Sequence, residues 1–122
     1  MLQDTLKVLH RAKALDAYKG AKAALAEGAN YSAYLCLKEA VRGLCCYVLA
    51  DQIPISQKTK LKNLLDQYPA TPDDAEDIMG FYKLVEAESG GLSSILSMGA
   101  KDLEGIRKSV KRLIGLYMDE DL

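Results

Sequence analysis

Three ionisable residues, Lys38, Glu39 and Arg42, interrupt an otherwise apolar stretch in the first half of the chain. Glu39 precedes Arg42 by three positions, a spacing at which a carboxylate and a guanidinium form an ion pair on one helix face. In one interpretation, Glu39 orients Arg42 towards a phosphate group. In the other, the two form an ordinary surface ion pair beside the core, worth at most about 1 kcal/mol.

A second group of cations lies near the C-terminus, where Arg107, Lys108, Lys111 and Arg112 recur at helical spacing. Such a cluster can bind phosphate, and a solvated outer helix face explains it equally well. Arg42 lies in the middle of one expected helix and Arg107 in the first half of another, so antiparallel packing would bring them level in one anion-binding groove. The candidate ligand-binding residues are Lys38, Glu39, Arg42, Arg107, Lys108 and Lys111.

Residues that would indicate a reaction are scarce. His10 is the only histidine, whereas RNA cleavage without a metal needs a base, an acid and a cation to stabilise the phosphorane. Histidine usually fills the proton-transfer roles, so we expect no catalytic residue. Gly90-Gly91 lacks the strand and the Lys-Ser/Thr pair of a phosphate-binding loop. The acids within residues 73–77 fit the first turn of a helix, where they complement its dipole.

Length and charge set further bounds. The chain has 122 residues and a net charge of −1, which predicts one domain over residues 1–122 and no strong non-specific attraction to nucleic acid. Residues 1–62 carry ten Lys/Arg against five Asp/Glu, whereas residues 63–100 carry one Lys against seven acids. Either these are ordinary solvated faces, or a basic patch and an acidic patch recognise partners or each other.

The three cysteines, Cys36, Cys45 and Cys46, lie within one expected helix. They have no Cys-x2-Cys spacing or partner histidine, so we expect no zinc site and interpret them as small buried residues in a reducing cytoplasm. No signal peptide opens the chain, and charges break its longest apolar stretch, so we expect no membrane span. The expected location is the cytoplasm, and no cofactor is implied.

Helical periodicity runs through most of the chain. Helices are expected over about residues 4–27, 31–51, 57–68, 72–88 and 100–118, with Asn30, Ser56 and Thr71 as caps of the second, third and fourth. Residues 89–99 are rich in Gly and Ser but contain apolar residues, which indicates an ordered loop or a single short turn. Residues 119–122 are expected to fray. The fold class is therefore all-α, an antiparallel up-and-down bundle of four to five helices.

Apolar residues at helical spacing define the expected buried faces. The first helix has an alanine-rich stripe, which would let a second helix approach closely. That stripe comprises Ala14, Ala17, Tyr18, Ala21, Ala24 and Leu25. The face of the second helix comprises Tyr34, Leu37, Val41, Leu44, Cys45, Val48 and Leu49, and that of the third comprises Leu61, Leu64, Leu65 and Tyr68. The face of the fourth comprises Ile78, Met79, Tyr82 and Val85, and that of the fifth comprises Leu103, Ile106, Val110, Leu113 and Tyr117.

The first two expected helices resemble the HEPN family of small prokaryotic helical bundles. That family shows an Ala-Leu run, a Gly, an aromatic residue, and then an Ala that leads a long helix with a Glu-Ala pair. The matching residues here are Ala23-Ala24-Leu25, Gly28, Tyr31, Ala33 and Glu39-Ala40, followed by Leu61, Leu64 and Leu65 for a later Leu-x2-Leu-Leu. The resemblance covers roughly residues 14–117 and implies a HEPN-like bundle, frequent homodimerisation, and RNA, nucleotide or protein partners.

Many HEPN proteins are ribonucleases whose hallmark is Arg followed, after four to six residues, by His. This chain departs from that pattern, because Arg107 and Arg112 have no His downstream and Lys60 stands where the family often has His. The resemblance therefore implies a non-catalytic homodimer that binds RNA, a nucleotide, or a partner such as a small nucleotidyltransferase in a toxin–antitoxin type of system. Two alternatives stay open: a ribonuclease with a degenerate site around Arg42 and Arg107, and a plain helical protein-interaction module.

Overall fold

The structure, a computed structural model, describes residues 2–52 and 59–122. All regular structure in these ranges is helical, which confirms the all-α class. The elements are α1 (Leu2–Ala26), α2 (Asn30–Leu49), α3 (Leu61–Gln67), the 3-10 turn η1 (Pro72–Asp74), α4 (Ala75–Ser89), α5 (Leu92–Leu96) and α6 (Ala100–Met118). None of the helices in these ranges has the length and hydrophobicity that crossing a bilayer requires.

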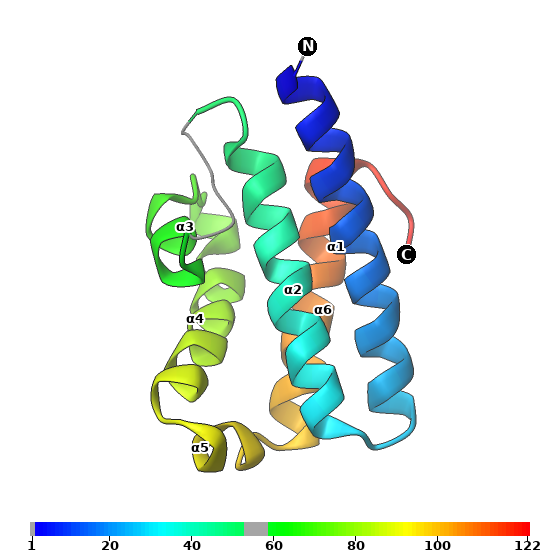
Figure 1. Cartoon of the computed structure of the whole chain (residues 1–122), viewed down its shortest axis with the longest axis vertical. Helices are drawn as coiled ribbons and strands as arrows, with labels where there is room; N and C mark the ends of the chain where they lie inside the picture. The colour runs from blue at the N-terminus through cyan, green and yellow to red at the C-terminus, as the bar shows by residue number, and fades with distance from the viewer. Residues whose placement is uncertain (1, 53–58) are drawn as a thin grey trace.

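The helices pack as a bundle around α2. Figure 1 shows α1 and α2 side by side as a long hairpin, with α6 packed behind both of them. α3 and α4 lie along the other side of α2, and α5 lies at the end of the bundle where α2 and α6 begin. Since α2 and α6 both lead away from that end, they run in the same direction (Figure 1).

Small residues allow α1 and α2 to approach closely. A methyl group at Gly43 of α2 would lie 3.0 Å from both the Cβ and the backbone nitrogen of Ala14 in α1. Further along the hairpin, a methyl group at Gly20 would lie 3.0 Å from the Cys36 sulfur. Ala14 and Ala21 are fully buried, so the alanine-rich stripe of the sequence is confirmed as the face that meets α2.

The hydrophobic core contains the expected faces of α2, α3 and α6. Leu37, Leu44 and Leu64 are fully buried. Three tyrosines, Tyr18, Tyr34 and Tyr68, also enter the core, as the expected faces predicted. The Tyr34 hydroxyl can be buried because it donates a hydrogen bond to the carbonyl oxygen of Leu84, 3.3 Å away.

The buried face of α4 keeps three of the four expected residues, because Ile78 is buried and Tyr82 and Val85 pack against the core, but its centre is shifted. Met79 is 70% exposed, whereas Phe81 and Leu84 are fully buried beside Ile78. Two helical faces share Ile78, and the structure buries the one that carries the larger apolar side chains. Removing an aromatic ring and a leucine from water stabilises the fold more than burying one methionine would.

Several helix ends also differ from the sequence-based boundaries. α2 begins at Asn30 itself, with Ala29 in the cap position and no side-chain cap bond. It ends at Leu49, two residues before the expected end. The expected cap of the third helix, Ser56, lies outside the described residues, and α3 begins at Leu61. Residues 89–99 contain the expected short turn as α5.

The residues after α6 are held against the bundle, so the expectation of a frayed tail is wrong. Asp119 adopts a left-handed conformation, with φ 55° and ψ 43°, and reverses the chain. Arg11 of α1 forms an ion pair with Glu120 and donates to the carbonyl oxygen of Met118 at 3.4 Å. Leu122 packs against the core.

Candidate functional site

A depression of about 450 Å³ lies along α6, and its basic wall comes from one face of that helix. The lining residues are Arg107, Lys108, Lys111, Arg112, Gly115 and residues 120–122. Positions three and four apart on a helix are neighbours, which explains why these cations gather there. Three of the six candidate ligand-binding residues therefore border one concave surface, which we call the α6 depression.

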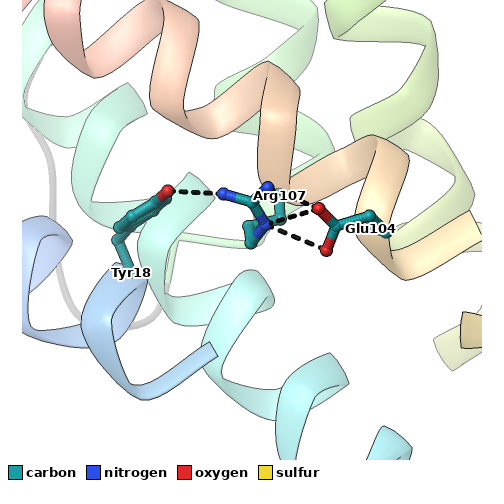
Figure 2. Close-up of polar contacts among 3 residues, drawn as sticks. All are labelled: Tyr18, Glu104 and Arg107. Atoms are coloured by element: carbon teal, nitrogen blue, oxygen red, sulfur yellow. Dashed lines mark hydrogen bonds and ion pairs between the residues drawn. The ribbon is translucent and has the colours of Figure 1, made fainter. Parts of the chain in front are cut away.

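Arg107 forms the inner edge of the α6 depression and is held by two partners. Its Nε lies 3.0 and 2.9 Å from the two carboxylate oxygens of Glu104, and its Nη2 also bonds to that carboxylate. On the opposite side of the guanidinium, Nη1 donates to the Tyr18 hydroxyl of α1 at 2.7 Å (Figure 2). A guanidinium whose side chain is only 14% exposed needs such partners, because an unpaired buried charge is costly.

The Arg107–Glu104 pair is ionised at neutral pH. Hydrogen bonds from Arg107 hold the pKa of the Glu104 carboxyl below its ordinary value. The same carboxylate raises the pKa of Arg107. Arg107 therefore contributes a fixed positive charge at the edge of the α6 depression, while most of its donors are already used within the protein.

Lys108 and Lys111 lie on the exposed part of the same wall. Each ammonium has three donors, and the two positions are neighbours on the helix surface. Like charges at this spacing repel each other, and an anion placed between them would relieve that repulsion. These two lysines are the side chains best placed to meet a phosphate from solvent.

Arg112, the fourth cation of the wall, is tied to a buried carboxylate. Asp74 is completely buried and accepts a hydrogen bond from Arg112 at 3.0 Å and another from the Tyr117 hydroxyl at 2.6 Å. Arg112 also pairs with Asp77 at 2.6 Å. Burial by itself raises the pKa of Asp74, but the bonds from Tyr117, Arg112 and Thr71 outweigh it and lower the pKa. Asp74 is thus more than a first-turn partner of the α4 dipole.

The candidates on α2 do not line the α6 depression. Lys38 pairs with Glu88 of α4 at 2.9 Å, and Arg42 donates to the carbonyl oxygen of Thr59, which precedes α3. Glu39 is exposed, and among the described residues no ion pair joins it to Arg42. Arg42 and Arg107 therefore have partners on different elements, and of the two only Arg107 lines the α6 depression.

His10 is half-buried on α1, away from the residues that line the α6 depression. Burial and the charges of Lys13 and Arg42 lower its pKa, so the imidazole is neutral at pH 7. An influence of Arg42 on His10 could not be expected from their positions in the sequence. The effect arises because the α1–α2 hairpin brings residues far apart in the chain close together.

The described residues offer little support for a cysteine nucleophile or a metal site. The three cysteines are free thiols, and burial raises the pKa of Cys45 and of Cys46, which disfavours the nucleophilic thiolate. In the part of the chain that the structure describes, no group of three or more His, Cys, Asp or Glu residues is placed to hold a metal ion. The arrangement of the α6 depression suits reversible binding of an anion.

Sequence reasoning missed the residues that position the cations of α6. The spacing of Glu104 and Arg107 is a local signal that could have identified that pair. Tyr18 and Asp74 gave no such signal, because they lie 89 and 38 positions from their arginine partners.

Fold and site together define a class: an all-α bundle with a cationic depression on its last helix. Comparisons with models of known protein families, with curated protein sequences and with solved structures found no match.

Proposed function

We propose that this protein is a non-catalytic binding protein that holds a phosphate-bearing ligand, either RNA or a nucleotide, in the α6 depression. The observation that carries the proposal is the position of Lys108 and Lys111, two exposed cations on the wall of a concave surface. Arg107 and Arg112 add positive charge beside them, and both are fixed by partners within the protein.

The α6 depression fits a ligand that carries phosphate groups better than it fits an uncharged ligand. Lysine ammonium groups act as point charges for phosphate oxygens. Arg107 and Arg112 are paired with carboxylates, so they lie beside the lysines without having to be ordered on binding. The α6 depression contains no residue suited to proton transfer near neutral pH, since its lining comprises cations, carboxylates, Gly115 and Leu122. We therefore expect the protein to bind its ligand without catalysing a reaction on it.

The finer parts of the proposal rest on the resemblance of residues 14–117 to the HEPN family. They are a HEPN-like bundle, a homodimer, and a partner such as a small nucleotidyltransferase in a toxin–antitoxin type of system. Three free thiols are compatible with a reducing cytoplasm as the location. A gene for a nucleotidyltransferase beside the gene for this chain would support that partner.

The binding proposal is tested with the full chain and two probes, a short single-stranded RNA and a nucleoside triphosphate. Lys108→Gln with Lys111→Gln should weaken binding of whichever probe binds by about tenfold or more at low salt. The matched control is Lys19→Gln with Lys22→Gln on α1, which removes two exposed lysines at the same helical spacing outside the α6 depression. Equal losses in both double variants, or no binding to either probe, would contradict the proposed function.

The absence of turnover has its own test. Mixed RNA incubated with the purified protein, with and without Mg²⁺, should show no cleavage above a mock preparation, because the histidine of the family motif is missing. Cleavage that survives His10→Ala but disappears in Arg42→Ala would overturn the non-catalytic assignment and favour a degenerate ribonuclease.

A helical protein-interaction module is the second candidate, and one observation favours it. Leu92 and Leu96 of α5 are 60% and 61% exposed, unusually high for two leucines one turn apart. If the protein is a helical protein-interaction module, the double substitution Leu92→Ser with Leu96→Ser should abolish binding of a protein partner and leave phosphate binding unchanged.

A further inference from the structure

The residues after α6 bring negative charge to the α6 depression. Glu120 and Asp121 line it together with the basic residues of α6. Both residues carry the same charge sign as a phosphate group, and the Glu120 carboxylate is paired with Arg11 of α1. We refer to residues 119–122 as the acidic tail.

Several contacts hold the acidic tail in this position. The left-handed Asp119 turns the chain back, a conformation that Asp and Asn tolerate better than most residues. The returning backbone passes next to Gly115 of α6, where an added methyl group would make an ordinary 3.4 Å contact with the Glu120 carbonyl oxygen. Leu122 then packs on the core. The tail is therefore placed by the fold on the mouth of the depression.

Arg11 of α1 is the residue that positions the carboxylates. It forms an ion pair with Glu120 and donates to the Met118 carbonyl oxygen, so it joins α1 both to the end of α6 and to the tail. Arg11 does not line the α6 depression. Arg11 can therefore act on a ligand there only through its charge at a distance or through the acidic tail.

We infer that the acidic tail competes with an anionic ligand for the α6 depression, and that Arg11 holds it in the competing position. The inference rests on the proposed function and adds a selectivity to it. Carboxylates near the lysines weaken the attraction for a single phosphate, whereas a ligand with several phosphates displaces the tail by occupying more cations. Displacement is feasible because the Arg11–Glu120 pair is partly exposed, and such pairs are weak.

The test measures binding of the same RNA and nucleoside triphosphate to variants of the full chain in which one carboxylate is replaced by the uncharged amide. Asp121→Asn and Glu120→Gln should each strengthen binding, by roughly three- to tenfold at low salt, because a nearby like charge is removed. Asp119→Asn is the matched control, since it removes the same charge two positions away, at a residue that does not line the depression and where Asn tolerates the left-handed conformation. It should change the affinity less than about twofold.

Arg11→Gln distinguishes positioning from simple charge. Release of the tail should strengthen anion binding, whereas loss of a distant positive charge alone would weaken it, so the sign of the change separates the two. In a Glu120→Gln background the same substitution should have little effect, because the two residues act as a pair. Amide hydrogen exchange at residues 119–122 should accelerate in Arg11→Gln and, in the wild-type chain, on addition of the bound probe.

The outcomes separate this inference from the proposed function. If binding depends on Lys108 and Lys111 but Asp121→Asn behaves like Asp119→Asn, the competition is refuted and the binding function survives. If the wild-type chain binds neither probe, the proposed function fails, and binding by the Asp121→Asn chain would then support the competition alone. If no variant binds either probe, both fail.

Discussion

The α1–α2 hairpin and the outer face of α6 use their residues in opposite ways. In the hairpin, Ala14 and Gly43 carry almost no side chain, and the backbones approach until an added methyl group would clash. On α6, long charged side chains extend outwards, and the arginines reach carboxylates and hydroxyls on other elements. The hairpin gains stability from close packing, whereas the α6 face gains a fixed pattern of charge.

This difference indicates which part of the molecule is free to bind. The hairpin interface has no room for a ligand, and a change of one methyl group is felt there. The α6 face has a depression, two exposed lysines and an acidic tail held largely by a partly exposed ion pair. Substitutions should therefore affect stability in the first region and binding in the second.

The largest expected effect is on the core side of this comparison. Leu44→Ala should lower the free energy of unfolding by about 2–5 kcal/mol, because Leu44 is fully buried and its truncation leaves a cavity. Lys108→Ala, on the exposed α6 face, should change it by less than about 0.5 kcal/mol. Chemical denaturation measures both. Similar midpoints for the two variants would break the division between a packed region and a binding region.

Two glycines of the hairpin test how close the packing is. Gly43→Ala should destabilise the protein by about 1–3 kcal/mol, because the new methyl group meets the backbone of Ala14, which cannot rotate away. Gly20→Ala meets the flexible end of Cys36, and it also gains helix propensity, so it should be neutral or slightly stabilising. Thermal unfolding of both variants decides the matter. A larger loss for Gly20→Ala would show that the helices cross elsewhere.

The charge network behind α6 should show a smaller, pH-dependent effect. Asp74→Asn should cost about 1–3 kcal/mol at pH 7, because the bonds from Arg112 and Tyr117 are weakened. The pKa of Asp74 is lowered in the folded protein, so the unfolded chain binds more protons at acid pH. The stabilisation is therefore complete above the ordinary Asp pKa of about 3.9 and is lost as the pH falls through the lowered value.

The neighbouring Asp73 provides the control for this experiment. Asp73→Asn changes an exposed carboxylate of the same turn and should leave the stability at pH 7 nearly unchanged. Denaturant unfolding between pH 7 and pH 2 should show that Asp74→Asn has a flatter acid limb than wild type or Asp73→Asn. Parallel acid limbs for all three would mean that Asp74 is not the carboxylate on which the network depends.

Much of the fold could be predicted from the sequence, because helical periodicity is a local property. On α1, α2, α3 and α6 the apolar residues are concentrated on one face, so a single register buries most of them. On α4 the pattern allowed two registers, and only the shape of the bundle selects the one with Phe81 inside. The order of residues 119–122 was missed because Arg11, which holds Glu120, lies 109 positions away.

The candidate site could be predicted only where its residues share a helix. Arg107, Lys108 and Lys111 were found because their spacing places them on one face of α6. The expectation of a groove shared by Arg42 and Arg107 depended on how α2 and α6 are oriented and placed relative to each other. The spacing of residues within one helix carries no information on that placement. The partners of Arg107 and Arg112 outside α6 are likewise a product of tertiary packing, since a sequence does not record which distant hydroxyl or carboxylate a guanidinium will meet.

The most direct test of the central claim is the salt dependence of RNA binding. Each phosphate contact made by a cation on a single strand contributes about 0.7 to the slope of log K against log salt, through counterion release. If Lys108 and Lys111 contact phosphate, replacing both by Gln should reduce the slope by about 1.4. The same change at Lys19 and Lys22 should leave the slope of the wild-type chain unaltered. Equal slopes for wild type and the Lys108/Lys111 variant would contradict phosphate binding in the α6 depression.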